Sequence, residues 1–354
     1  MDSSIHVNSR SIGEKYTPFI IAEMSANHNG RIEDAFKIVD LAVEAGADAI
    51  KMQTYRPDTI TLKSHRPEFF IEEGLWKGQT LYDLYEKAHT PWEWHKPLFD
   101  HAHTRGITIF SSPFDKTAID LLEDLNAPAY KIASFEAVDL ELIAYAASTG
   151  KPLIISTGMA DTDEIGEAIT AARDAGGKEI AILHCVSGYP APPQDYNLRV
   201  IPDMIERFGL VTGLSDHTMD NSTAIASVAL GASIIEKHFT LNRSGGGPDD
   251  SFSLEPKEMN NLCYGANVAW SALGKINFSR KPSEKANIQF RRSLYFVKDL
   301  RSGDIISEDS VKSVRPGFGL PPKFLKEVIG QKITTNISKN TPVKNEHLFN
   351  PIDL

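Results

Sequence analysis

The chain has 354 residues, of which 41% are hydrophobic, and this suits one large domain and one small one. Its formal net charge of −10 gives no general attraction to nucleic acid or to anionic membranes, so we expect neither as a partner. Only two cysteines occur, and no apolar run has the length of a membrane span or the form of a signal peptide, so we expect a cytoplasmic protein.

From Phe19 onward, short β-type runs alternate with amphipathic helical patterns. We expect eight strands, at residues 19–23, 49–53, 108–112, 129–134, 153–157, 180–185, 211–215 and 234–239. Eight strand–helix units in about 255 residues are typical of a (β/α)8 TIM barrel. A doubly wound open sheet is the alternative, but no glycine-rich dinucleotide turn follows the first strand.

Residues 55–90 separate the second expected strand from its helix, and this connection is much longer than usual. The active site of a TIM barrel lies at the C-terminal ends of the strands, where connections of this kind begin. We therefore expect this segment to cap the catalytic face of the barrel.

A polar stretch that contains proline breaks the alternation after the last barrel helix. We expect the barrel to occupy residues 1–275, a linker to occupy 276–288 and a small β-rich domain to occupy 289–354. The small domain contains a faint repeat, because residues 297–311 and 334–348 align at an offset of 37. Its 66 residues form little core of their own, so we expect this domain to pack on another surface.

Two lysines, Lys51 and Lys131, lie near the C-terminal ends of expected strands. A buried ammonium group is costly unless carboxylates or a bound anion compensate its charge. Serines stand at similar positions on other strands: Ser112, Ser134, Ser156 and Ser215. Lysines and serines together suit a ligand with phosphate and carboxylate groups. The alternative is an internal ion pair with Glu23, Glu136 or Glu236.

Two histidines, His217 and His238, end neighbouring strands and could bind one divalent metal together. Two protein ligands leave coordination positions open for a substrate oxygen and water, as a Lewis-acid site requires. The alternative for each is a core histidine whose ring nitrogens have hydrogen-bond partners within the protein.

The loop "NRSGGGPDD" follows the last strand, and Asp249 or Asp250 in it is a candidate for binding sugar hydroxyls or metal-held water. A flexible acidic turn is the alternative there.

Many of these residues belong to motifs that resemble the sialic acid synthase family of phosphoenolpyruvate-dependent condensing enzymes. In order over residues 19–250 the motifs are "IIAEMSANHNG", "AIKMQTY", "SSPFD", "YKIASFE", "ISTGMA", "HCVSGYPAP", "GLSDHT", "EKHFT" and "GGGPDD". The resemblance continues through "RRSLYFVKDLRSGDIISEDSVKSVRPG", which is similar to the small antifreeze-protein-like (SAF, β-clip) domain of the family. It implies a TIM barrel followed by that domain, with phosphoenolpyruvate and an amino-sugar aldehyde as substrates.

Within the family, "FFIEEGLWKGQTLYDLYEKAHTPWEWH" with "SSPFD" and "ASFE" resembles the pseudaminic acid synthase branch. Sialic and legionaminic acid synthases usually have glycine where Phe135 stands and asparagine where Ser187 stands. These departures imply 2,4-diacetamido-2,4,6-trideoxy-altrose as acceptor in place of N-acetylmannosamine. An N-acetylneuraminic or legionaminic acid synthase with the same mechanism is the alternative.

The resemblance also implies roles for single residues. His217 and His238 would bind Mn²⁺, or else Mg²⁺ or Co²⁺. Phosphoenolpyruvate would contact Lys51, Ser112, Lys131, Ser134, Ser156, Ser187, Tyr189 and Ser215. The acceptor sugar would contact Gln53, Phe135, Asp249 and Arg315. The catalytic residues would be Glu23, Lys51, Gln53, Lys131, Glu136 and Glu236.

The resemblance implies in addition a domain-swapped homodimer, in which the small domain of one subunit lends Arg315 to the barrel of its partner.

Other functions would require different features of the sequence. A Schiff-base aldolase would use one desolvated lysine as nucleophile. An amidohydrolase would normally have a His-x-His pair on the first strand, which "AEMSANHNG" lacks. A carbohydrate-binding protein without catalysis would need only residues 289–354.

Overall fold

The computed structural model describes residues 3–353, and within them the chain forms two compact units, which meet in sequence between Gly274 and Lys275. The first unit contains a closed barrel of eight parallel strands, so the expected TIM barrel is confirmed for the described residues. Its strands are β3 (Phe19–Glu23), β4 (Ala49–Thr54), β5 (Thr108–Pro113), β6 (Tyr130–Ile132), β7 (Leu153–Ser156), β8 (Ile180–Cys185), β9 (Val211–Asp216) and β10 (Ile234–His238). Closure follows because β10 pairs with both β9 and β3.

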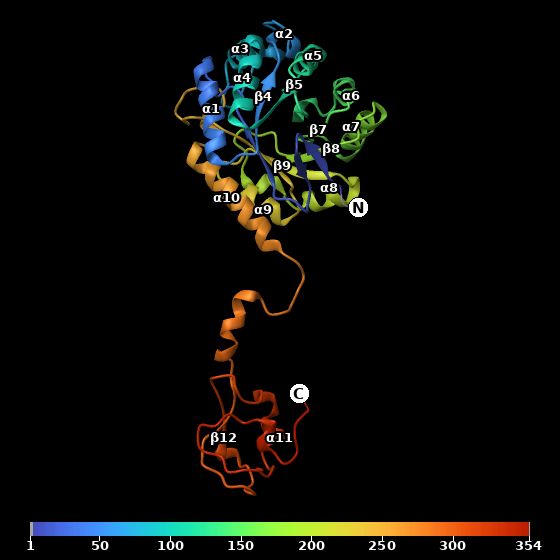
Figure 1. Ribbon diagram of the computed structural model, residues 1–354. Coiled ribbons are helices and arrows are strands. Elements are labelled where there is room, and N and C mark those ends of the chain that lie inside the picture. Colours follow the sequence, from blue (N-terminus) through green and yellow to red (C-terminus); the bar gives the residue numbers. More distant parts are fainter. Residues whose placement is uncertain (1–2, 354) are drawn as a thin grey trace. The chain divides into compact units, whose positions relative to one another are not determined.

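Helices surround the strands of this unit (Figure 1). They are α1 (Ile32–Ala45), α4 (Trp92–Arg105), α5 (Lys116–Asp124), α6 (Leu140–Ser148), α7 (Thr162–Asp174), α8 (Val200–Phe208), α9 (Ser222–Ala229) and α10 (Pro256–Leu273). Aspartate side chains accept hydrogen bonds from the first backbone N–H groups of α5, α6 and α7. Glycines in the left-handed conformation end α1, α4 and α8.

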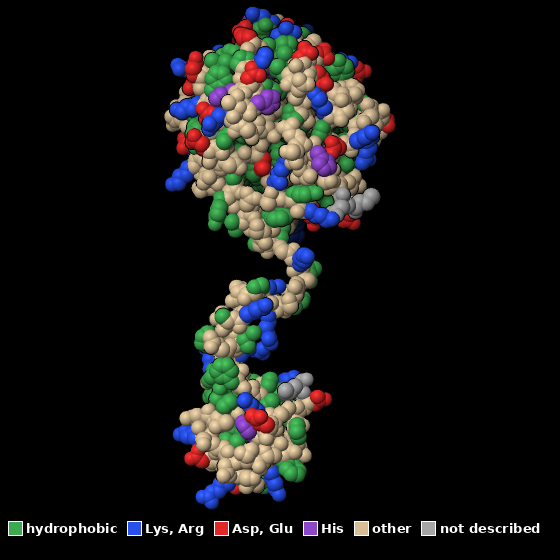
Figure 2. Space-filling model, viewed as in Figure 1, with side chains coloured by type: hydrophobic (Ala, Val, Ile, Leu, Met, Phe, Trp, Pro, Cys, Tyr) green, Lys and Arg blue, Asp and Glu red, His purple; other side chains and the backbone are tan. Residues whose placement is uncertain are grey.

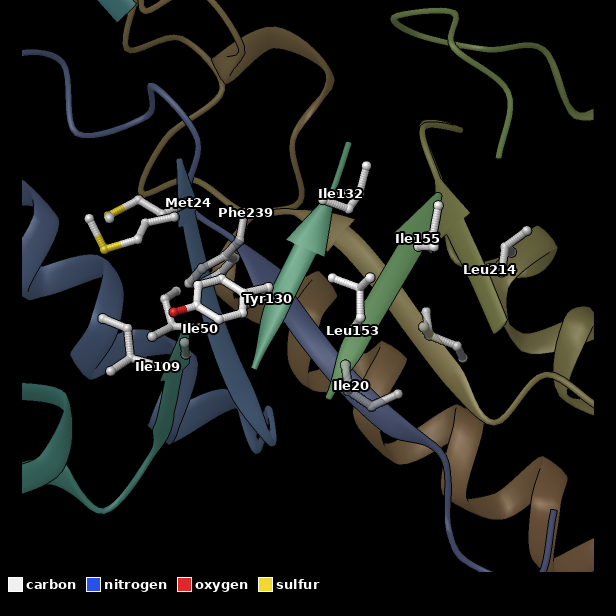
Figure 3. Packing of buried hydrophobic residues seen from close by; sticks show 14 of the residues in the cluster. Ile20, Met24, Ile50, Ile109, Tyr130, Ile132, Leu153, Ile155, Leu214 and Phe239 are labelled. Atoms are coloured by element: carbon white, nitrogen blue, oxygen red, sulfur yellow. The ribbon is translucent and has the colours of Figure 1, made fainter. Parts of the chain in front are cut away.

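Outward-facing side chains of the strands pack against these helices. Figure 3 shows part of this layer, including Ile20, Ile50, Ile109, Tyr130 and Leu153, all of which are buried. Because parallel strands of a barrel are covered on both faces, the outward positions need to be as apolar as the inward ones. The expected strands therefore appear in the sequence as nearly continuous apolar runs.

Inside the barrel the side chains change from apolar to polar along each strand. The lower interior layers consist of Phe19, Ile21, Ala49, Phe110, Ala129, Ile154, Ala181, Leu183, Val211 and Ile234. Successive side chains of a strand alternate between the two faces, so the next inward residue lies two positions further on. Those next positions hold Glu23, Lys51, Ser112, Lys131, Ser156, Cys185 and Glu236. The polar layer therefore lies at the C-terminal ends of the strands.

A short N-terminal hairpin, β1 (Ile5–Val7) and β2 (Arg10–Ile12), was not expected from the sequence. Its three apolar residues Ile5, Val7 and Ile12 are buried in the same cluster as the lower interior layers. The hairpin therefore closes the barrel at the end opposite the polar layer.

The strand β6 is shorter than the expected 129–134, because residues Ser134–Glu136 form a 3-10 helix.

The long segment after β4 contains α2 (Pro57–Ile60), a 3-10 turn (Pro67–Phe69) and α3 (Leu81–Ala88). Residues from this segment line the same cavity as the polar strand ends. The expectation that this segment caps the catalytic face of the barrel therefore agrees with the structure. Among residues 3–353, no helix has the length and apolar character needed to cross a membrane.

The second unit contains β11 (Ser293–Phe296) paired antiparallel with β12 (Val311–Val314), a short helix α11 (Leu325–Val328), and several 3-10 turns. Its two repeated segments contact each other symmetrically. Leu300 and Ile337, which align at the offset of 37, exchange both backbone hydrogen bonds, at 2.9 and 2.8 Å. The aligned side chains of Asp299 and Asn336 each accept a hydrogen bond from a backbone N–H of the other segment. The faint repeat therefore corresponds to an approximate two-fold arrangement.

The two units carry opposite charge. Residues 1–274 contain 22 Lys and Arg against 39 Asp and Glu, which is a formal net charge of −17. Residues 275–354 contain 15 Lys and Arg against 8 Asp and Glu, which is a formal net charge of +7. Blue side chains are spread over the visible face of the second unit (Figure 2).

Candidate active site

A cavity of about 470 Å³ opens at the C-terminal ends of the barrel strands. Its polar residues come mainly from the strand ends, and its apolar residues come mainly from the segment between β4 and α4. This is the end at which TIM barrels have their active sites. The cavity is large enough for a small organic substrate.

The floor of the cavity carries a network of four buried charges. The Lys51 ammonium lies 2.6 Å from a carboxylate oxygen of Glu23 and 3.7 Å from one of Glu236. Lys131 lies 3.4 Å from the other Glu236 oxygen. All four side chains are at most 6% exposed, so their charges balance one another away from water. The alternative expected from the sequence, an internal ion pair, is therefore present in the structure, with Glu23 and Glu236 as the carboxylates.

The two carboxylates of this network differ in acidity. Burial raises the pKa of Glu23 despite the adjacent Lys51. Burial acts on Glu236 too, but Lys131, Lys51 and a hydrogen bond from Ser215 together hold its pKa below the ordinary value. Glu236 is therefore the more acidic of the two, and Glu23 is the one better suited to exchange a proton.

Serine hydroxyls surround the lysines. Lys131 donates to Ser156 at 2.7 Å, and Lys51 contacts Ser112 at 3.3 Å. Ser134 and Ser187 hydrogen bond each other at 2.8 Å. Ammonium and hydroxyl groups together form a region that can bind a phosphate or carboxylate group once a ligand replaces the internal partners.

A second polar branch leads from the floor toward the loop after β10. Gln53 donates hydrogen bonds to Glu23 and to Ser25, both at 3.0 Å. Ser25 in turn donates to Asp249 at 2.5 Å. Burial raises the pKa of Asp249 to about 6. Burial also raises the pKa of Glu136, on the opposite side of the cavity, to about 7, and one of its oxygens is buried without a hydrogen-bond partner among the described residues.

The rings of His217 and His238 lie side by side above this floor, with centroids 5.4 Å apart. His217 Nδ1 lies 2.7 Å from the carbonyl oxygen of Val186, so the Nδ1 proton is donated there and Nε2 is left unprotonated. His238 Nδ1 is buried without a hydrogen-bond partner among the described residues and lies 3.9 Å from Asp249. Burial lowers the pKa of His217 to about 4 and that of His238 well below its usual range.

Neutral imidazoles are the form that binds metal ions, so these two histidines fit a divalent cation. Among residues 3–353, no group of three or more His, Cys, Asp or Glu side chains is arranged as a ready-made metal site. Two histidines alone would leave the remaining coordination positions to substrate and water.

A buried ion pair lies directly behind the histidines. Lys237 donates to Asp216 at 2.9 Å and to the carbonyl oxygen of Thr218 at 2.7 Å, and both charged side chains are at most 2% exposed. Asp216 precedes His217 and Lys237 precedes His238, so the pair connects β9 and β10 where the histidines emerge. This pair explains why a charged residue precedes each histidine in the sequence.

Most of the residues expected at the site line one cavity. They are Lys51, Gln53, Lys131, Ser134, Phe135, Glu136, Ser156, Ser187, Tyr189, Ser215, His217, Glu236, His238 and Asp249. Glu23 and Ser112 lie beneath its surface, in contact with Lys51. Asp250, the other candidate of its loop, instead accepts hydrogen bonds from Thr240 and Gly247, so it holds the loop together. Arg315 belongs to the second unit, next to Arg291 and Arg292.

Several cavity residues were not expected from the sequence, namely Ser25, Tyr55, Ile60, Ile71, Trp76, Leu84, Tyr85 and Phe114. Trp76 donates to the carbonyl oxygen of Pro248 at 3.0 Å, and its ring lies 6.0 Å from that of Tyr189. Most of the others belong to the segment that was expected to cap the barrel. The length of that segment predicted that it lies over the site, but the segment contains no motif that identifies which of its side chains point into the cavity.

Residues 38–278 match the NeuB family, and residues 291–348 match the SAF domain. The chain is 43% identical to the pseudaminic acid synthase of Helicobacter pylori, over 94% of this chain and 98% of that protein. It is 44% identical to a pseudaminic acid synthase of Campylobacter jejuni, over 92% of this chain and 95% of that protein. Among solved structures, the N-acetylneuraminic acid synthetase of Leptospira borgpetersenii is 30% identical, with a TM-score of 0.73 over 82% of this chain and 97% of that one.

Proposed function

Because the chain belongs to the NeuB family, we propose that it condenses phosphoenolpyruvate with an amino-sugar aldehyde and water, releasing phosphate. The acceptor in this proposal is 2,4-diacetamido-2,4,6-trideoxy-altrose. The product is pseudaminic acid, which is the product that the names of the 43–44% identical relatives give. The observation that carries the proposal is the buried network of two lysines and two glutamates on the cavity floor, below two neutral histidines.

Phosphoenolpyruvate binds over the lysines. Its phosphate and carboxylate replace the carboxylate contacts of Lys51 and Lys131, and hydroxyls of Ser156 and Ser134 supply further donors. In the reaction C3 of phosphoenolpyruvate forms a bond to the aldehyde carbon of the acceptor, and the aldehyde oxygen takes up a proton. Water then adds to C2 and loses a proton, which leaves a hydroxyl and the phosphate on C2. The bond from C2 to the phosphate oxygen breaks, the hydroxyl proton passes to the departing phosphate, and a keto group remains. No redox partner is needed.

The carboxyl groups of the site are suited to these proton transfers. Glu23 and Glu136 both have raised pKa values, so the ionised form of each is a stronger base toward the attacking water than an ordinary carboxylate; the pKa of Glu136, about 7, suits this role near neutral pH. Before phosphoenolpyruvate binds, Glu236, whose pKa Lys131 and Lys51 lower, holds both ammonium groups at the cavity floor, where their charges then face the departing phosphate.

A divalent metal, Mn²⁺ or else Mg²⁺ or Co²⁺, is part of this proposal, held by His217 and His238. When bound, it supplies Lewis-acid polarisation of the acceptor aldehyde. The support for it is the pair of neutral, buried imidazoles, one with an unpartnered nitrogen. Asp249, with a pKa of about 6, is ionised at neutral pH and adds negative charge beside His238.

A homodimer is also part of the proposal, in which Arg315 of one copy reaches the acceptor bound to its partner. The support is the charge difference between the units, −17 against +7, which favours docking of the second unit of one copy on the first unit of another. Ile276 and Phe278, at 97% and 100% exposed, provide apolar surface that such docking would cover.

Phosphate release with different acceptors tests the proposed function. The protein is mixed with phosphoenolpyruvate and Mn²⁺. The acceptor is the diacetamido-trideoxy-altrose, the stereoisomeric diacetamido-trideoxy hexose that leads to legionaminic acid, or N-acetylmannosamine. We expect rapid release with the altrose alone. Equal or faster release with N-acetylmannosamine would instead assign the chain to N-acetylneuraminate synthesis, as in the Leptospira protein.

A further inference from the structure

The cavity has two halves of different chemistry. Its floor is polar, as described above, and its upper wall is apolar, with side chains from Ile60, Ile71, Leu81, Leu84 and Phe114. All of these except Phe114 belong to the segment between β4 and α4. The wall therefore originates from one insertion, separate from the strand ends that carry the polar floor.

Two tyrosines lie within this wall. The ring of Tyr55 meets those of Tyr85 and Phe114 edge-on, with centroid distances of 5.7 and 5.2 Å, and Tyr55 is only 2% exposed. These contacts fix the direction of both phenol groups. Neither hydroxyl has a hydrogen-bond partner among residues 3–353, although both side chains line the cavity. Burial and the nearby Glu136 raise the pKa of Tyr85, so its hydroxyl stays protonated and able to donate.

The reaction determines how the acceptor lies in the cavity. Its aldehyde carbon must meet phosphoenolpyruvate at the polar floor, so carbons 4 to 6 lie toward the apolar wall. The proposed acceptor has an acetamido group at C4 and a methyl group at C6, whereas N-acetylmannosamine has hydroxyls at both positions. The two acceptors therefore differ at the end that meets the wall.

We propose that this wall selects the acceptor: Ile60, Ile71 and Leu84 receive the C6 methyl group, and the hydroxyls of Tyr55 and Tyr85 hydrogen bond the C4 acetamido group. This inference rests on the proposed function and assigns its specificity to the insertion. The tyrosine hydroxyls are polar groups that lack partners in the cavity, and the acetamido carbonyl and N–H supply them.

The selection acts in both directions. An acceptor with a hydroxyl at C6 leaves that group without a partner against aliphatic side chains, which an apolar pocket disfavours by up to about 100-fold in kcat/KM. An acceptor with a hydroxyl at C4 lacks the amide carbonyl and N–H that would pair with the two phenols. The separate preferences at C4 and at C6 multiply into a stronger preference for the whole sugar.

The test uses small side-chain changes in the full-length enzyme. Tyr55→Phe and Tyr85→Phe each remove one hydroxyl. Tyr82→Phe is the control, because Tyr82 lies on α3 as Tyr85 does, but outside the cavity and beside Lys63. Ile71→Thr makes this part of the wall polar, and it also shortens the side chain by one heavy atom. Each variant is assayed with the diacetamido-trideoxy acceptor, its 4-hydroxy counterpart and its 6-hydroxy counterpart, and melting temperatures check the fold.

We expect Tyr55→Phe or Tyr85→Phe to lower kcat/KM about tenfold for the 4-acetamido acceptors and less than threefold for the 4-hydroxy one. We expect Ile71→Thr to reduce the preference for 6-deoxy over 6-hydroxy acceptor about tenfold. The KM for phosphoenolpyruvate and the Tyr82→Phe control should not change.

Equal losses for the 4-acetamido and 4-hydroxy acceptors, or no loss in either tyrosine variant, would overturn the tyrosine assignment. An unchanged 6-deoxy preference in Ile71→Thr would overturn the assignment of the methyl group. If the wild-type enzyme releases no phosphate with the diacetamido acceptor, the proposed function itself fails, and this inference fails with it. The wild-type measurement therefore separates the two failures.

Discussion

Replacement of Lys237 by methionine tests whether the ion pair behind the histidines stabilises the barrel. The substitution removes the ammonium group that contacts Asp216 at 2.9 Å and the carbonyl oxygen of Thr218 at 2.7 Å. Methionine has a similar shape, so packing changes little. The Asp216 carboxylate is then buried with hydrogen bonds from Thr218 but without a counter-charge.

The magnitude follows from the burial of the pair. Loss of one partner from a fully buried ion pair costs about 3–5 kcal/mol, whereas an exposed pair contributes about 0–1 kcal/mol. The Lys237 and Asp216 side chains are 2% and 0% exposed, so the larger range applies. The double variant Asp216→Asn with Lys237→Met removes both charges, and we expect it to recover more than half of the loss. Lys96→Met is the control, because Lys96 pairs with Asp100 at 2.7 Å on the surface.

Urea unfolding followed by tryptophan fluorescence measures the effect. All four tryptophans of the chain, at positions 76, 92, 94 and 270, belong to the first unit, so the signal reports the barrel alone. We expect a fall of about 3 kcal/mol or more in the free energy of unfolding for Lys237→Met, and under about 0.5 kcal/mol for Lys96→Met. Equal small losses in both variants, or a double variant less stable than Lys237→Met, would refute the reasoning.

Three further predictions concern catalysis. His217→Ala and His238→Ala should each abolish phosphate release and weaken Mn²⁺ binding at least 100-fold in calorimetric titration, whereas His103→Ala on the surface should leave both unchanged. Arg315→Ala should raise the acceptor KM about tenfold in steady-state assays and leave the KM for phosphoenolpyruvate unchanged; the reverse pattern would contradict its acceptor role. If ionised Glu136 is the base, kcat/KM should rise with pH through about 7, because its raised pKa keeps it protonated below that value, and Glu136→Gln should remove this limb of the pH profile.

The raised pKa of Glu136 has a consequence for stability as well. A carboxyl group whose pKa is higher in the folded state than in the unfolded state favours folding only while it is protonated. The free energy of unfolding of the wild-type barrel should therefore fall as pH rises from about 4.5 to about 7, and Glu136→Gln should reduce this slope. This dependence is measured in the same urea experiment at several pH values.

The sequence by itself determined the barrel and the chemistry of its floor. The direction of a side chain in a strand alternates with period two, so an apolar inward residue followed two positions later by Lys, Glu or Ser already indicates a polar layer at the strand end. Lys51, Lys131 and Glu236 could therefore be assigned to one face and one end of the barrel without coordinates. The repeat in the second unit was visible because its aligned apolar residues are local features of the chain.

Only the tertiary structure decided which of these groups meet. Lys51 contacts Glu23 more closely than Glu236, and Asp216 pairs with Lys237 across two strands, because closure of the barrel sets distances that no local pattern contains. The N-terminal hairpin and the apolar wall of the cavity were missed for the same reason. Short loops and short helices have little periodicity, so the side chains they direct into a cavity depend on long-range packing, which the order of residues does not display.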